Sequence, residues 1–318
     1  MGRSFRRGLS VLLLVAVVAI VAPTLTACSA QDGADQASTV REEPVAAFPV
    51  TVTDDLGREV TVDSEPQRIV SLAPANTEIL YGLGLLDRVV GVTSFDDYPP
   101  EVADLPKVGD FVGPNVEAVA ALEPDLVLAT GGVQQDVIEQ IEGTGATVIA
   151  VDPQSVEGLY ESIRTVGAVT GVSEAADALV VSMQEDIAAV QSELQGVLPV
   201  TVFVEIAQDP LFTAGRGTLI DELITLAGGT NVVKDEGYVG YSVEQLLEDD
   251  PEFYLATLGS MSDPAALQDR PGYGELSAVK NGNVGILTDN LVSRPGPRIT
   301  EGIREIAGIL HPDVFGED

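Results

Sequence analysis

The sequence lacks tryptophan and has only one cysteine, one histidine and three lysines in 318 residues. With Cys28 and His311 as the sole residues of their types, His-pair zinc sites and Cys–His nucleophile pairs are excluded. No Gly-x-x-x-x-Gly-Lys loop is present to hold a phosphate. A carboxylate-only metal site stays open, because 50 acidic residues make accidental clusters common. This lack of catalytic groups favours reversible binding over chemistry.

Basic residues are also scarce, with 16 Lys and Arg against 50 Asp and Glu and a net charge of −34. Nucleic-acid binding requires Lys and Arg to neutralise the phosphates, so a protein this acidic is repelled by nucleic acid. Anionic lipid repels it for the same reason. We interpret the acidity as an aid to solubility at an exposed or salty surface.

Long apolar runs are absent except near the start, where residues 11–22 are all apolar. This run is too short to span a bilayer and has the size and basic flank of a secretory signal. The following Leu-Thr-Ala-Cys, residues 25–28, resembles a bacterial lipobox. We expect a signal peptide over 1–27, a lipid on Cys28 and a flexible tether over 28–47. The protein would then be extracytoplasmic and anchored to the cell membrane; the alternative is an ordinary signal peptide that happens to contain a cysteine.

The remaining sequence alternates short β-rich and helical segments. Residues 48–62 predict a β-hairpin, and the alternation that begins at Arg68 predicts βαβ units on a mostly parallel sheet. Residues 173–194 predict the longest helix, with Ser173 as its cap. The alternation then resumes after Pro199, with residues 211–215 interpreted as a turn. We therefore expect an α/β fold with two lobes, residues 48–172 and 198–318, joined by one rigid linking helix within 173–197.

Several motifs occur in an order that resembles a known family, the solute-binding lipoproteins of ABC importers for cobalamin and ferric siderophores. In the first half these are Arg68–Leu80, Val90–Thr93, Tyr98–Pro100, Lys107–Gly109, Pro114–Glu117 and Glu123–Val127. In the second half they are Pro210–Gly215, Ser242–Glu244 and Arg294–Arg298. The resemblance implies two α/β lobes joined by a single long helix, with the ligand in the cleft between them.

The resemblance also implies roles for individual residues. Relatives present one glutamate per lobe to arginines of the permease, and the matching positions are Glu117 and Glu244. The simpler interpretation is that each carboxylate only complements a helix dipole, which contributes ~0.3–1 kcal/mol. The positions that match ligand contacts, or lie near them, are Phe95, Phe111, Thr130, Phe212, Tyr238, Tyr241, Asn290 and Arg294.

The identity of the ligand stays open between a ferric siderophore and a cobalamin-type corrinoid. Cobalamin-binding relatives clamp the ring with tryptophans, which this chain lacks. Haem is disfavoured because the usual axial histidine is missing, although a tyrosine can serve. We expect a monomer without enzymatic activity, cofactor or bound metal ion of its own, whose partners are an ABC permease and ATPase. The alternatives are a sensor ectodomain for a metal chelate and a metal-cofactor enzyme.

Overall fold

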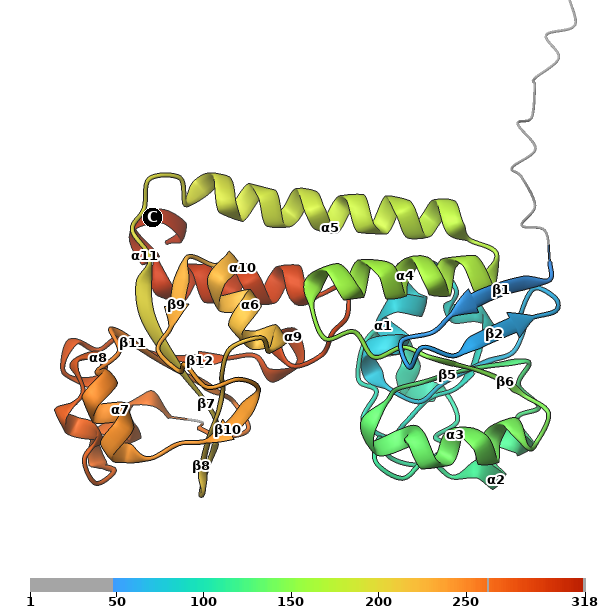
Figure 1. Cartoon of the computed structure of the whole chain (residues 1–318), viewed down its shortest axis with the longest axis horizontal. Coiled ribbons are helices and arrows are strands. Elements are labelled where there is room, and N and C mark those ends of the chain that lie inside the picture. Colours follow the sequence, from blue (N-terminus) through green and yellow to red (C-terminus); the bar gives the residue numbers. More distant parts are fainter. Residues whose placement is uncertain (1–47, 262, 317–318) are drawn as a thin grey trace, which may run out of the picture. The chain divides into compact units, whose positions relative to one another are not determined.

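Two large β-sheets with helices packed against them, together with a small two-stranded sheet, form the part of the chain that the structure describes (Figure 1). The computed structural model describes residues 48–261 and 263–316, all within the same compact unit. The predicted signal peptide (1–27), the lipidation site Cys28 and the tether (28–47) lie outside the described residues. Within the described ranges, no helix has both the length and the apolar character needed to cross a membrane.

The predicted hairpin is confirmed. Strands β1 (Val50–Thr53) and β2 (Glu59–Val62) pair antiparallel along their full length. In the turn between them, Asp54 forms an ion pair with Arg58 at 2.6 Å. Asp54 also accepts a hydrogen bond from the backbone N–H of Ala150 at 3.1 Å. The turn is thereby fixed to the edge of the first large sheet.

The first large sheet has four parallel strands in the order β4-β3-β5-β6. The strands are β3 (Ile69–Ser71), β4 (Val89–Gly91), β5 (Leu126–Ala129) and β6 (Thr147–Ala150). Its helices are α1 (Pro74–Gly82), α2 (Val116–Ala121), α3 (Gln135–Glu142) and α4 (Val156–Thr170). Leu126 and Leu128 pack on the face toward α1 and α4, and Val127 packs toward α2 and α3. This alternation explains why β5 is apolar throughout, since a parallel strand is covered on both faces.

The second large sheet is mixed, with the order β10-β8-β7-β11-β12 and β9 also paired to β7. Its strands are β7 (Val200–Gln208), β8 (Leu211–Ala214), β9 (Gly229–Asn231), β10 (Tyr238–Gly240), β11 (Phe253–Thr257) and β12 (Val284–Leu287). The prediction of a turn at residues 211–215 is wrong, because β8 pairs antiparallel with both β7 and β10. The parallel pairs of β7 with β9 and β11, and of β11 with β12, keep the sheet mostly parallel, as predicted.

The second half also contains six α-helices among its described residues, and short 3-10 segments occur in both halves. The helices are α6 (Leu219–Leu226), α7 (Val243–Asp249), α8 (Ser277–Asn281), α9 (Asp289–Val292), α10 (Ile299–Leu310) and α11 (Pro312–Phe315). The 3-10 segments are η1 (Leu86–Arg88), η2 (Pro100–Asp104), η3 (Gly132–Gln134), η4 (Pro264–Asp269) and η5 (Tyr273–Glu275).

The predicted long helix is α5 (Ser173–Glu193), which carries the chain from the first half to the second (Figure 1). Its N-cap is Val172, so Ser173 begins the helix and does not cap it. One stripe of α5 is buried, at spacings of four and three residues: Ala176, Val180, Met183, Ile187 and Val190. This stripe packs on α4 and α10 and belongs to one apolar cluster that reaches both large sheets. At 1.5 Å per residue the helix is ~30 Å long, and packing along its length makes it rigid.

A pair of glycine substitutions tests the close packing of α4 on α5. A Cβ at Gly167 would lie 2.4 Å from the Cβ of Ala176, whereas one at Gly308 in α10 meets nothing within 4 Å. Gly167→Ala is expected to lower the free energy of unfolding by about 1–3 kcal/mol through overpacking. Gly308→Ala is expected to raise it by about 0.4–1 kcal/mol, because alanine has less conformational entropy to lose. Urea denaturation measures both, and a stabilising Gly167→Ala would contradict the packing argument.

Candidate functional site

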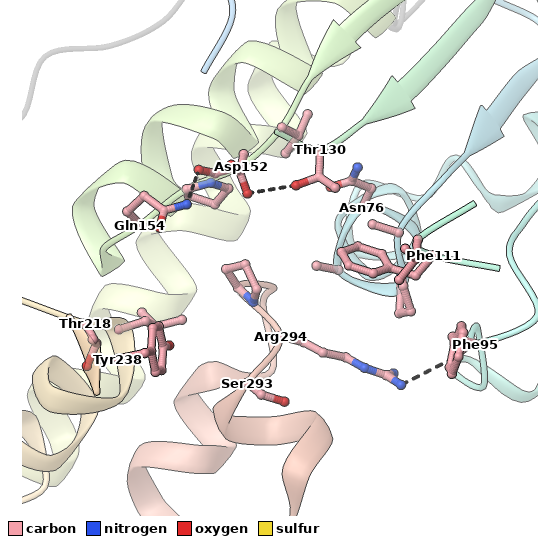
Figure 2. A pocket seen from close by; sticks show the side chains of 18 of the residues that line it. Asn76, Phe95, Phe111, Thr130, Asp152, Gln154, Thr218, Tyr238, Ser293 and Arg294 are labelled. Carbon is pink, nitrogen blue, oxygen red and sulfur yellow. Dashed lines mark hydrogen bonds between the residues drawn. The ribbon is translucent and has the colours of Figure 1, made fainter. Parts of the chain in front are cut away.

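A pocket of about 570 Å³ lies where segments of both halves meet (Figure 2). The first half supplies residues that directly follow parallel strands: Ala73, Pro74, Ala75 and Asn76 after β3, Thr130 after β5, and Val151, Asp152, Pro153 and Gln154 after β6. The chain order reverses between β3 and β5, and such a switch point at the carboxyl ends of parallel strands is the usual place for a ligand. The pocket volume is also within the usual range for small-molecule sites, about 300–1,000 Å³.

Polar side chains on this edge are held by hydrogen bonds to each other and to the backbone (Figure 2). The Thr130 hydroxyl donates to Asp152 Oδ1 at 2.7 Å, and the Gln154 amide donates to the Asp152 carbonyl at 2.9 Å. Asn76 Nδ2 donates to the carbonyl of Ala129 at 3.3 Å. These residues are therefore fixed before any ligand arrives, which reduces the entropy cost of binding.

Aromatic side chains lie on both sides of the pocket. Phe95 and Phe111 come from loops of the first half, and Tyr238 comes from β10 on the opposite side (Figure 2). Phe95 is 57% exposed and Tyr238 is 52% exposed. Large apolar side chains exposed at a pocket mouth are available to cover the faces of a ligand.

The guanidinium of Arg294 lies on the pocket wall among acidic partners. Its Nη1 is 2.6 Å from Asp97 Oδ1 and 3.3 Å from Glu78 Oε1. Glu78 also binds Arg298 through two bonds, Nε–Oε2 at 3.1 Å and Nη2–Oε1 at 2.7 Å. The charges of these four residues sum to zero, so the wall offers no unbalanced cation.

The electrostatics of Asp97 agree with this pairing. Burial on its own raises the pKa of the Asp97 carboxyl, but the hydrogen bond and charge of Arg294, together with the Asn290 amide, bring the pKa below its ordinary value. The carboxyl is therefore ionised at neutral pH and holds its proton less readily than a free aspartate.

Of the eight residues expected to contact the ligand, five line the pocket: Phe95, Phe111, Thr130, Tyr238 and Arg294. Phe212, Tyr241 and Asn290 do not line it. Phe212 is on β8 and pairs with Gly240, two residues along the strands from the Ala214–Tyr238 pair. Tyr241 packs against Phe203 with ring centroids 5.4 Å apart, and its hydroxyl donates to Asp249. Asn290 donates to Asp97 Oδ2 at 2.7 Å. This hydrogen bond orients the Asp97 carboxylate, whose other oxygen binds Arg294.

Several polar lining residues were missed at the level of sequence. They are Asn76, Asp152, Gln154, Thr218 and Ser293. A signal for Asp152 and Gln154 was present, because both follow a predicted parallel strand at the sheet edge where ligands bind. Thr218 follows the antiparallel strand β8, and Ser293 is separated from strand β12 by helix α9, so only the fold brings them to the pocket.

The two glutamates expected to dock on a permease are both exposed. Glu117 is in the first turn of α2, whose cap Asn115 accepts from the Ala118 N–H at 3.0 Å. Glu244 is in the first turn of α7, where Ser242 plays the same role for Gln245 at 3.1 Å. In the described part of the chain neither glutamate forms an ion pair. Both short helices lie on the side away from α5 in Figure 1.

No group of three or more metal-ligating side chains occurs among residues 48–261 and 263–316. The sole histidine, His311, is buried at the end of α10, where its Nε2 is 3.2 Å from the Gly228 carbonyl.

Comparison with known proteins gives the class of this fold and site. The family model described as periplasmic binding protein matches residues 69–291, so the chain belongs to that family. An uncharacterized ABC transporter substrate-binding lipoprotein of Bacillus subtilis is 38% identical, over 98% of this chain and 99% of that protein. A cobalamin-binding protein of Halobacterium salinarum is 30% identical over 94% of this chain and 84% of its own length.

Solved structures agree on the fold. A candidate iron-binding, periplasmic solute-binding protein of Staphylococcus epidermidis superimposes with a TM-score of 0.71 at 30% identity, over 78% of this chain and 100% of that one. The predicted family and the predicted two-lobed α/β fold are thereby confirmed. As a member of this family, the chain is a substrate-binding protein of an ABC transporter.

Proposed function

We propose that this protein captures a neutral metal chelate of the corrinoid class in its pocket and delivers it, chemically unchanged, to an ABC permease. The observation that carries the proposal is the wall around Arg294, whose charge is balanced by Asp97 and Glu78. The aromatic residues Phe95, Phe111 and Tyr238 add apolar surface on either side. A multiply anionic chelate would find no free cation here, whereas a neutral ring would find apolar surface.

A second candidate ligand is a neutral ferric hydroxamate. It satisfies the same charge balance, and the absence of tryptophan removes the large clamp expected for a corrin ring. The resemblance to a candidate iron-binding protein of Staphylococcus epidermidis supports this alternative.

Calorimetric titration separates the two candidates. We expect dicyanocobinamide and cobalamin to bind with a stoichiometry of one, and the trianionic ferric enterobactin not to bind. Binding of ferrichrome alone would move the assignment to ferric hydroxamates. Tight binding of ferric enterobactin would contradict the proposal of a neutral ligand.

A tyrosine pair tests the position of the ligand. Tyr238→Ala is expected to raise the Kd for the ligand about tenfold, because it removes an exposed ring from the pocket. Tyr241→Ala is the matched control, since it also removes a tyrosine ring, but one that lies outside the pocket, against Phe203 and Asp249. Equal effects of the two substitutions in calorimetry would contradict the assignment of the pocket.

The remaining features fit delivery at a membrane. We propose that residues 48–172 and 198–318 act as two lobes held by the linking segment 173–197, which allows only small closure because α5 packs along its length. A lipid on Cys28 and the tether over 28–47 would hold these lobes near the permease. A sensor ectodomain would share these features, so transport itself has to be measured.

A further inference from the structure

The acidic partners of Arg294 do not contribute equally to its neutralisation. Glu78 gives both of its oxygens to Arg298, at 2.7 and 3.1 Å, and its contact with Arg294 is longer, at 3.3 Å. Asp97 Oδ1 is 2.6 Å from Arg294 Nη1. The short, charge-assisted contact of Arg294 is therefore the one to Asp97.

Asp97 is held in place for this contact. Its second oxygen, Oδ2, accepts from Asn290 Nδ2 at 2.7 Å. The other end of the guanidinium is fixed too, since Arg294 Nη2 donates to the carbonyl of Phe95 at 3.3 Å. The Arg294 side chain is only 14% exposed, and its residue lines the pocket. Arg294 thus belongs to the pocket wall, and Asp97, which lies beside the wall with its side chain 55% exposed, helps to hold the guanidinium in a fixed geometry.

We propose that Asp97 is a specificity-determining residue that prevents anionic ligands from using Arg294. This inference rests on the proposed function, because it explains how a pocket that contains an arginine selects neutral chelates. An anion that approaches Arg294 meets the Asp97 carboxylate beside it and must compete with an existing ion pair. Removal of the Asp97 charge leaves Arg294 with its longer contacts to Glu78 and to the Phe95 carbonyl, both at 3.3 Å, so the guanidinium can bind an anion from the pocket.

Two fluorescent probes test this without knowledge of the natural ligand. N-phenyl-1-naphthylamine is neutral, and 8-anilinonaphthalene-1-sulfonate has the same ring system with one sulfonate. The ratio of their Kd values reports the charge preference of the pocket and cancels effects on ring binding. In the wild type we expect the neutral probe to bind more tightly.

Asp97→Asn is expected to improve the affinity for the sulfonate probe about tenfold relative to the neutral one. The matched control is Asp186→Asn, which makes the same change of net charge at an exposed position of α5 and should leave the ratio unchanged. In the double variant Asp97→Asn/Arg294→Gln the gain should vanish, because the freed guanidinium is gone. A thermal melt of each variant verifies folding.

The ratio of probe affinities decides the inference. An unchanged ratio in Asp97→Asn, an equal change in Asp186→Asn, or a gain that survives in the double variant would each overturn it. Failure of the proposed function has a different signature, since it appears in the wild type as absence of corrinoid binding, whatever the probes report.

Discussion

Replacement of Glu78 by glutamine is expected to lower the free energy of unfolding by about 3–5 kcal/mol, the usual effect of breaking a buried ion pair from one side. The Glu78 side chain is 2% exposed and is shared by Arg294 and Arg298, which are 14% and 16% exposed. Glutamine keeps the shape and removes the charge. Arg298 then retains the ring of Tyr98, 4.0 Å away, but loses the one carboxylate that forms an ion pair with it within the described residues.

The control is the exposed ion pair between Arg164 and Asp177, whose atoms are 3.1 Å apart and whose side chains are 44% and 67% exposed. Asp177→Asn should cost less than about 1 kcal/mol, because solvent screens an exposed pair. Urea denaturation followed by circular dichroism measures both variants. If Glu78→Gln costs no more than Asp177→Asn, the buried cluster contributes little to stability.

Most of the alternating strands and helices could be predicted because each of these segments has its own local sequence pattern. Strand β5 is fully apolar and helix α5 shows its buried stripe at helical spacing, so type and approximate position follow from the sequence. Strand β8 has no such signal. It has four residues between Pro210 and Gly215, and its partners β7 and β10 define it more than its own sequence does. Because the strand depends on these partners, its own sequence predicts a turn.

The site was less predictable, and the tyrosines near β10 show why. Tyr238 and Tyr241 are three positions apart, and alternation along an extended chain directs residues with odd separation to opposite faces. Tyr238 lines the pocket, whereas Tyr241 packs with the cluster on the other side of the sheet. Asn290 illustrates a second limit, because its partner Asp97 is 193 residues away in sequence. No local pattern identifies a contact of that range.

Loss of uptake with retained ligand affinity is the expected result for the double variant Glu117→Ala/Glu244→Ala. Both carboxylates are exposed, and among the described residues neither has an ion-pair partner, so each is available to an arginine of the permease. A carboxylate can bind arginine through two parallel hydrogen bonds, and such pairs orient a complex strongly. Neither residue lines the pocket, so the Kd for the ligand should stay the same.

Uptake of radiolabelled corrinoid into cells that carry the permease and ATPase measures the loss, and calorimetry on the purified variant measures the affinity. The matched control is Glu174→Ala/Glu185→Ala on α5, where both glutamates are exposed and Glu174 also lies in a first helical turn. This control also removes two negative charges and, at Glu174, the same type of helix-dipole interaction, at the opposite side of the molecule from α2 and α7. Only docking predicts that the first pair stops uptake and the second does not. Normal uptake by Glu117→Ala/Glu244→Ala would contradict a docking role and would mean that the two glutamates only stabilise their own helices.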